Sequence, residues 1–182
     1  IAVNVSARAL AHSEFTPRLN DLRRSLGSHG FGLVVELTEE SLISDYDSAL
    51  ARLHRIKKTG VELSIDDFGK GYSSLGYLKD IPASEIKIDK QFVATVPEDE
   101  KNLHIMKATT DLAHAFGMRV VGEGVDNERS LKVLEDIGCE LAQGFFIARP
   151  MRAALLQEWM RAYDSASTLA HPWSESAVAA GA

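Results

Sequence analysis

The side chains best suited to chemistry lie at the ends of short β-branched runs, which are predicted strands. A carboxylate buried without a cation or a donor is unfavourable, so solvation alone does not explain polar groups on strand after strand. In α/β barrels the C-terminal strand ends carry the active site. We therefore predict that these side chains converge on one site. Asn4 ends the first run, Glu36 the second, and Asp66 and Asp67 the third; Lys87 lies in the fourth, Glu123 ends the fifth, and Gln143 opens the sixth.

The residue types indicate which metal this site would hold. Carboxylates with an amide oxygen and no thiolate form a hard, all-oxygen ligand set that suits Mg²⁺ or Mn²⁺. The adjacent Asp66 and Asp67 could serve two ions, with one carboxylate bridging them. Two ions roughly 3.5–4 Å apart clamp the attacking and leaving oxygens of a phosphoryl displacement. Lys87 could orient the attacking water or stabilise charge on the phosphate.

Each of these residues also has a purely structural interpretation. Asn4 is a turn-forming residue type, Asp66 and Asp67 could cap a helix or form a turn, and Lys87 could lie solvated on an edge strand. A different enzyme class also stays open, an enolase-like barrel in which carboxylates hold Mg²⁺ and a lysine base abstracts a proton. The doubled aspartate favours two metals and phosphodiester chemistry over that class.

Alternation of strands and helices predicts how these groups are positioned. It indicates a parallel sheet, either open or closed into a barrel. The predicted strands cover residues 1–5, 33–37, 61–65, 85–88, 119–121 and 142–147. Apolar residues at helical spacing predict helices around residues 50–57, 105–116, 131–137 and 155–160, and Gly60, Gly117 and Gly138 end the first three.

Composition limits the classes of function. The net charge is −6 and no basic block occurs, so a nucleic-acid polymer is excluded as a partner. A nucleotide ligand stays possible, because bound metal ions supply positive charge locally. Cys139 is the only cysteine, which indicates a reducing compartment and a cytoplasmic domain. The chain begins without Met, and we expect it to belong to a longer protein whose other regions could anchor it to a membrane.

The motifs around these residues resemble those of the EAL-domain cyclic di-GMP phosphodiesterases. The resemblance runs from Ile1 to about Met151. The matching strings, in order, are Asn4-Val5-Ser6, Glu36-Leu37-Thr38-Glu39, Asp66-Asp67-Phe68-Gly69, Gly71-Tyr72-Ser73-Ser74-Leu75, Lys87-Ile88-Asp89, Glu123-Gly124-Val125 and Gln143-Gly144-Phe145.

This resemblance implies an α/β fold, a TIM-like barrel of which residues 1–164 would supply strands 3 to 8. It implies hydrolysis of cyclic di-GMP to the linear dinucleotide pGpG with two Mg²⁺ or Mn²⁺ ions. The all-oxygen ligand set itself predicts inhibition by Ca²⁺, which accepts longer bonds and more ligands. Residues 165–182 are small, polar and aperiodic, which predicts a flexible C-terminal tail. It also implies a homodimer through the segment near residues 72–79 and an upstream sensory or GGDEF domain. An idle cyclic di-GMP receptor is the alternative within the family.

The resemblance also implies a role for each matching residue. Asn4, Glu36 and Asp66 look like the ligands of one metal, and Asp66, Asp67 and Glu123 like those of the second. Lys87 resembles a water-activating lysine, and Gln143 an amide that positions the water. The substrate and loop residues of the family's pattern correspond to Asn4, Gly69, Gly71, Tyr72, Ser73, Ser74 and Asp126.

Four departures from the family's pattern stand out. The Glu-Ala-Leu motif that names the family would lie on a strand before Ile1, so two strands of the barrel are absent from this sequence. Lys70 stands where the loop usually has Thr, Asp126 where a loop-steadying Glu is usual, and Glu40 where a Ser is usual. The last three changes concern coupling between the loop and the site, and they leave the metal-binding positions in place.

Overall fold

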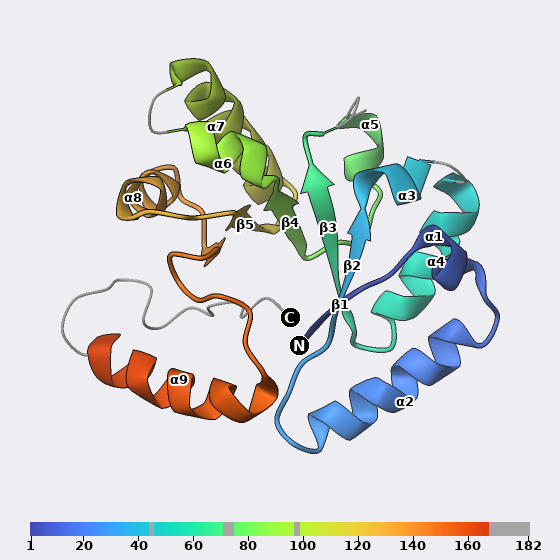
Figure 1. Cartoon of the computed structure of the whole chain (residues 1–182). Coiled ribbons are helices and arrows are strands. Elements are labelled where there is room, and N and C mark those ends of the chain that lie inside the picture. Colours follow the sequence, from blue (N-terminus) through green and yellow to red (C-terminus); the bar gives the residue numbers. More distant parts are fainter. Residues whose placement is uncertain (44–45, 71–74, 97–98, 168–182) are drawn as a thin grey trace.

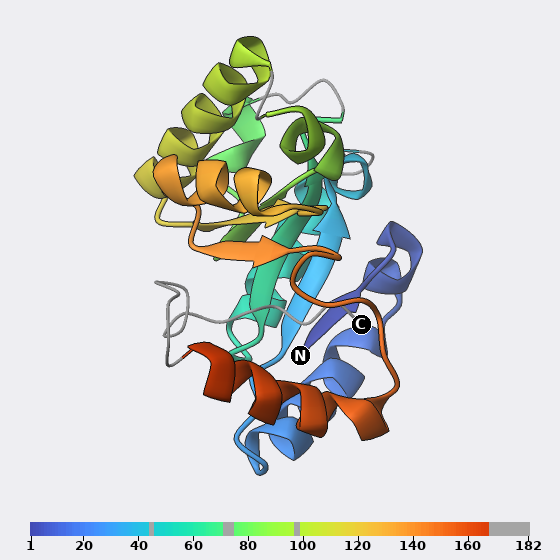
Figure 2. The same ribbon diagram turned by 60° about the vertical axis from the view of Figure 1, so that its left-hand side comes forward.

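Six parallel strands form one curled sheet in the order of the sequence, β1 to β6 (Figures 1 and 2). The structure is a computed structural model and describes residues 1–43, 46–70, 75–96 and 99–167. Each strand pairs with its sequence neighbour, which confirms the predicted parallel sheet. The strands are β1 Ala2–Asn4, β2 Val34–Thr38, β3 Glu62–Phe68, β4 Glu85–Ile88, β5 Arg119–Glu123 and β6 Leu141–Gln143.

Helices α1 to α8 lie in the connections between strands, and α9 follows the last strand (Figure 2). Helix α4 packs against β3, and α7 packs against β4 and β5. The helices are α1 Ala7–Ala11, α2 Phe15–Gly27, α3 Glu39–Ile43, α4 Tyr46–Lys57, α5 Leu75–Leu78, α6 Lys90–Thr95, α7 Glu100–Ala115, α8 Glu128–Asp136 and α9 Ala153–Ser167. The structure thus confirms the four predicted helices, and glycines with positive φ follow α4, α7 and α8.

Alternation along the strands separates an apolar face from a polar one. Val35, Leu63, Ile86 and Val120 are almost fully buried on four neighbouring strands and join the hydrophobic core with the helices. The residues between them point to the other face of the sheet, because side chains alternate along a strand. That inner face carries Glu36, Ser64, Glu85 and Lys87, all of them buried.

Several boundary predictions differ from the structure, and β3 continues to Phe68 where residue 65 was the predicted end. The sixth strand was predicted to cover 142–147, with Gln143 at its start, but β6 ends at Gln143. From Gly144 the chain turns, and the amides of Ile147 and Ala148 donate to the carbonyl of Gly144. Gln143 therefore lies at the C-terminal end of its strand, as Asn4 and Glu123 do.

Helix α9 continues to Ser167, so residues 165–167, which were assigned to the predicted tail, are helical. Residues 168–182 lie outside the described part of the chain. In Figure 1, α9 lies below the arrows of β2 and β3, on the side where these strands begin. None of the helices in the described ranges is long and apolar enough to cross a membrane.

Gly144 fixes the connection between the ends of β5 and β6. A β-carbon at this position would lie 2.0 Å from the Val125 carbonyl oxygen and 2.3 Å from its nitrogen. We expect Gly144→Ala to lower the free energy of unfolding by about 1–3 kcal/mol or more, because backbone atoms cannot rotate away from the added methyl group. Gly32→Ala is the matched control, since a β-carbon there meets nothing within 4 Å. Equal denaturant midpoints for the two variants would contradict this account.

Candidate functional site

The ammonium group of Lys87 lies at the centre of the candidate site. Its Nζ atom is 2.7 Å from Glu123 Oε1, 3.1 Å from Glu36 Oε1 and 3.3 Å from Asp66 Oδ1. Lys87 is only 4% exposed, so this contact is largely shielded from water. Four strands, β2 to β5, thus supply one charged group each to a single cluster. The prediction that Glu36, Asp66 and Glu123 converge on one side of the sheet is confirmed.

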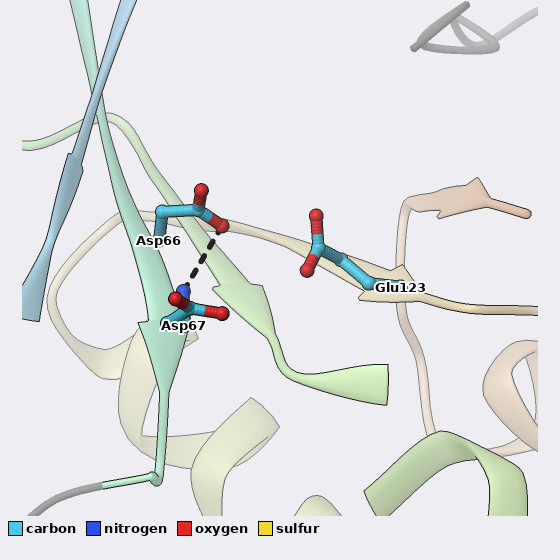
Figure 3. A group of neighbouring side chains, drawn as sticks. All are labelled: Asp66, Asp67 and Glu123. Carbon is cyan, nitrogen blue, oxygen red and sulfur yellow. Dashed lines mark hydrogen bonds between the residues drawn. The ribbon is translucent and has the colours of Figure 1, made fainter. Parts of the chain in front are cut away.

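Asp67 joins two of these carboxylates on the same side of the site. Oxygen atoms of Asp66, Asp67 and Glu123 all lie within 4.8 Å of one another. Figure 3 shows Asp66 and Asp67 projecting from β3 and Glu123 from β5, with the carboxylates directed toward a common space. Three carboxylates facing one space repel one another unless a cation lies among them.

An irregularity in β3 lets two consecutive aspartates serve the same site. Successive side chains on a regular strand point to opposite faces, but the register with β4 shifts between Ile65 and Phe68. Asp67 has φ +56°, which is uncommon for a residue other than glycine. Its backbone amide donates a 3.0 Å hydrogen bond to Asp66 Oδ1. The bent backbone therefore brings Asp67 to the same side as Asp66.

Burial and charge shift the pKa values of the central groups in a consistent way. Burial lowers the pKa of the Lys87 ammonium, but the hydrogen bond from Lys87 to Glu123 and the surrounding negative charges outweigh it, and the net effect raises the pKa. Burial also raises the pKa of the Glu123 carboxyl, and the Lys87 ammonium opposes this shift. Lys87 thus stays charged across the physiological range and neutralises part of the cluster.

Asn4 and Gln143 lie at the two ends of this row of strands. Asn4 pairs in register with Glu36, and the two residues line one pocket of about 820 Å³ together with Thr38 and Ser41. Gln143 pairs in register with Glu123. Both residues therefore occupy the strand ends beside the carboxylate cluster. Their roles as metal ligand and as water-positioning amide stay predictions.

The loop after β3 is described only at its beginning. Gly69 has φ +96°, and its amide donates to Glu39 Oε2 at 3.4 Å. Lys70 forms ion pairs with Asp67, at 2.5 Å, and with Asp89, at 2.8 Å. Asp126 is exposed and accepts a hydrogen bond from Asn127. Gly71, Tyr72, Ser73 and Ser74, with part of the predicted dimer segment, lie outside the described residues.

Asp89 is the residue of this region to which sequence reasoning assigned no role. It is buried, its Oδ1 accepts from the Gln91 amide at 2.9 Å, and it caps helix α6. Burial raises the pKa of the Asp89 carboxyl, but the hydrogen bonds from Lys70 and Gln91 outweigh it and lower the pKa overall. The available signal was its place two residues after Lys87, directly behind the strand that carries the central cation.

The donor set fits one or two small divalent ions. Asp66, Asp67 and Glu123 offer only oxygen atoms, which Mg²⁺ and Mn²⁺ prefer. Cys139 is buried in the hydrophobic core, shares a hydrogen bond with Thr110 and precedes the start of β6, so it is not at the C-terminal strand ends. Glu36 and Asn4 add two further oxygen donors at the neighbouring strand ends.

A scan against protein-family models matches residues 1–150 to the EAL domain. The chain belongs to the EAL-domain family. The resemblance seen in the sequence is thereby confirmed, and so is the fold, because solved EAL domains superpose on this chain. The EAL domain of Mycobacterium smegmatis DcpA covers 88% of it with a TM-score of 0.80 and 33% identity, and the match spans 72% of that chain.

Two curated relatives of this EAL domain are named as enzymes of cyclic di-GMP. It is 36% identical over 163 residues, 90% of its length, to the cyclic di-GMP phosphodiesterase NbdA of Pseudomonas aeruginosa. It is 42% identical over 159 residues, 86% of its length, to the bifunctional diguanylate cyclase/cyclic di-GMP phosphodiesterase MucR of the same species. The chain spans 21% and 23% of these relatives, so it corresponds to a minor part of each.

Two solved relatives hold the nucleotide. The MucR phosphodiesterase in complex with cyclic di-GMP has a TM-score of 0.74 and 39% identity, covering 86% of this chain and 63% of that one. Klebsiella pneumoniae BlrP1 has been solved with cyclic di-GMP and manganese, with a TM-score of 0.74 and 30% identity over 82% of this chain and 38% of that one. A calcium complex of BlrP1 also matches, with a TM-score of 0.73.

The carboxylate cluster makes a direct prediction about metal binding. Asp66→Asn keeps the size of the side chain but removes its charge, and we expect Mn²⁺ affinity to fall by about tenfold or more. Isothermal titration of the full-length protein with Mn²⁺ measures this change. Asp111→Asn on the exposed side of α7 is the control, because it removes one carboxylate away from the strand ends. Equal Mn²⁺ affinity in Asp66→Asn and the parent would contradict the ligand assignment.

Proposed function

We propose that this EAL domain hydrolyses cyclic di-GMP to linear pGpG at a two-metal site, and so lowers the level of this second messenger. The observation that carries the proposal is the convergence of Glu36, Asp66 and Glu123 on the buried Lys87, with Asp67 beside them. Membership in the EAL family and the names of its relatives support the substrate. The doubled carboxylates favour hydrolysis over binding alone.

Each residue of the site would have a separate role in metal binding or catalysis. Asn4, Glu36 and Asp66 would hold one ion, and Asp66, Asp67 and Glu123 the other. Bound Mg²⁺ or Mn²⁺ would supply Lewis-acid chemistry and lower the pKa of a water molecule. In the overall reaction a water oxygen adds to phosphorus, the bond to a ribose 3′ oxygen breaks, and that oxygen ends with a proton from the water.

Lys87 would act on the reacting oxygens rather than on the metals. Its charge has the same sign as that of the ions, so it does not help to retain them. Its buried Nζ can donate hydrogen bonds to the attacking water or to the phosphate, where a preorganised donor stabilises developing negative charge. Gln143 would position the same water from the end of β6, and Gly69 to Ser74 with Asp126 would form the loop over the substrate.

The proposal extends to the surroundings of the domain. We infer a homodimer through residues 72–79, a cytoplasmic location, and an upstream sensory or GGDEF domain in the whole protein. The short share of NbdA and MucR that the chain matches supports the last of these.

Metal dependence tests the proposed reaction. We expect the full-length protein to convert cyclic di-GMP to pGpG in Mg²⁺ or Mn²⁺, with little turnover in Ca²⁺. Ca²⁺ accepts longer bonds and more ligands, so it should occupy the site while spoiling the spacing of the ions. Chromatography of the nucleotides measures the cyclic di-GMP that is consumed and the pGpG that is formed. Tight binding of cyclic di-GMP without any cleavage would favour the receptor alternative, and full activity in Ca²⁺ alone would overturn the metal assignment.

Removal of the central ammonium tests the role of Lys87. Lys87→Met keeps most of the side-chain volume but removes the donor, and we expect kcat to fall by roughly a hundredfold or more, the scale of losing one preorganised donor. Binding of cyclic di-GMP should change little, because the donor acts mainly in the transition state. Lys58→Met, on the exposed turn after α4, is the control. Unchanged kcat in Lys87→Met would refute the assigned role.

A further inference from the structure

Lys70 lies at the edge of the carboxylate cluster and is held by two acidic side chains. Its Nζ atom is 2.5 Å from Asp67 Oδ1 and 2.8 Å from Asp89 Oδ2. Asp89 is only 2% exposed, whereas the Lys70 side chain is 45% exposed. The ammonium group therefore bridges a buried anchor and one of the three carboxylates that face the common space.

The Asp67 carboxylate can bind either of two cations, the Lys70 ammonium or a divalent metal ion. Asp67 belongs to the cluster whose oxygens lie within 4.8 Å of one another, yet its Oδ1 atom is already bonded to Lys70. A divalent ion bound by Asp67 would be repelled by an ammonium at hydrogen-bonding distance from the same carboxylate. Either the ion binds less tightly, or the lysine has to leave Asp67 when the ion arrives.

The geometry allows Lys70 to leave Asp67 and to return. Its stem is flexible and partly in water, so a rotation of the side chain disturbs no packed core. Asp89 offers a second partner that stays in place, because it caps helix α6 and is held by the Gln91 amide. An ammonium released from Asp67 can thus keep its contact with Asp89 and remain next to the site.

We propose that Lys70 is an internal cation that competes with the second metal ion for Asp67 and thereby lowers the occupancy of that position. This inference rests on the two-metal site of the proposed function and concerns its regulation. The position is the one at which the family's pattern has a neutral Thr, so the competition is a property of this chain. Catalysis would then require a higher metal concentration, because the reaction needs both ions while the ammonium displaces one.

Metal titration of the full-length protein without nucleotide tests the inference. Mn²⁺ binding to the parent and to Lys70→Met is followed by electron paramagnetic resonance, which counts free ions. We expect two bound ions in both proteins, with the weaker Kd about tenfold lower in Lys70→Met, the scale of repulsion between a single and a double charge about 6 Å apart in water. The tighter Kd should change by less than about twofold.

Two further variants separate charge from shape. Lys70→Arg keeps the positive charge, and we expect its weaker Kd to stay within about twofold of the parent value. Lys132→Met is the matched control, because Lys132 also pairs with two carboxylates, Glu135 at 2.9 Å and Asp136 at 3.1 Å, on the exposed surface of α8. It should leave both Kd values unchanged, which shows that loss of overall charge is not the cause.

The outcomes that would overturn the inference are distinct from those that would overturn the proposed function. A weaker or unchanged second Kd in Lys70→Met, or a shift that Lys132→Met reproduces, means that Lys70 does not compete. Binding of a single ion in both parent and Lys70→Met also refutes it. A parent that never cleaves cyclic di-GMP, yet binds its second Mn²⁺ more tightly after Lys70→Met, refutes the phosphodiesterase proposal and leaves the competition established.

Discussion

Several like charges share one largely buried space, and the rest of the structure is arranged around that constraint. Glu36, Asp66 and Glu123 approach closely at the strand ends, where their mutual repulsion would be large without a cation. The Lys87 ammonium, on β4, is that cation, and it forms ion pairs of 2.7–3.3 Å with all three carboxylates. Lys87 thereby offsets part of the negative charge that gathers in this space.

The sheet delivers these groups because parallel strands end on the same side. Pairing in register sets Glu36 beside Asn4, and Gln143 beside Glu123. The face of the strands opposite the site is apolar and packs against the helices, so the polar face is left free to turn inward. One irregularity, in β3, breaks the alternation and directs Asp67 to the same space as Asp66.

The beginning of the loop after β3 connects this cluster to the neighbouring helix. Lys70 links Asp67 to Asp89, which also caps α6, and the Gly69 amide contacts Glu39 at the start of α3. The first residues of the loop are therefore tied both to the carboxylate cluster and to the start of helix α6.

The sequence by itself determined the family, the order of strands and helices, and most of the candidate site. Those features depend on local patterns: apolar periodicity, glycines that end helices, and polar residues such as Asn4, Glu36 and Glu123 at the ends of β-branched runs. The sequence predicted too late an end for the sixth strand, because the apolar run through Phe145 and Phe146 has the pattern of a strand. In the structure, turn hydrogen bonds to the Gly144 carbonyl end the strand at Gln143. Only the tertiary structure decided that Lys87 contacts three carboxylates, that Asp67 turns to join Asp66, and that Lys70 bridges Asp67 and Asp89. Such contacts join residues on different strands or depend on a backbone bend, and no periodicity along the chain encodes the distance between them.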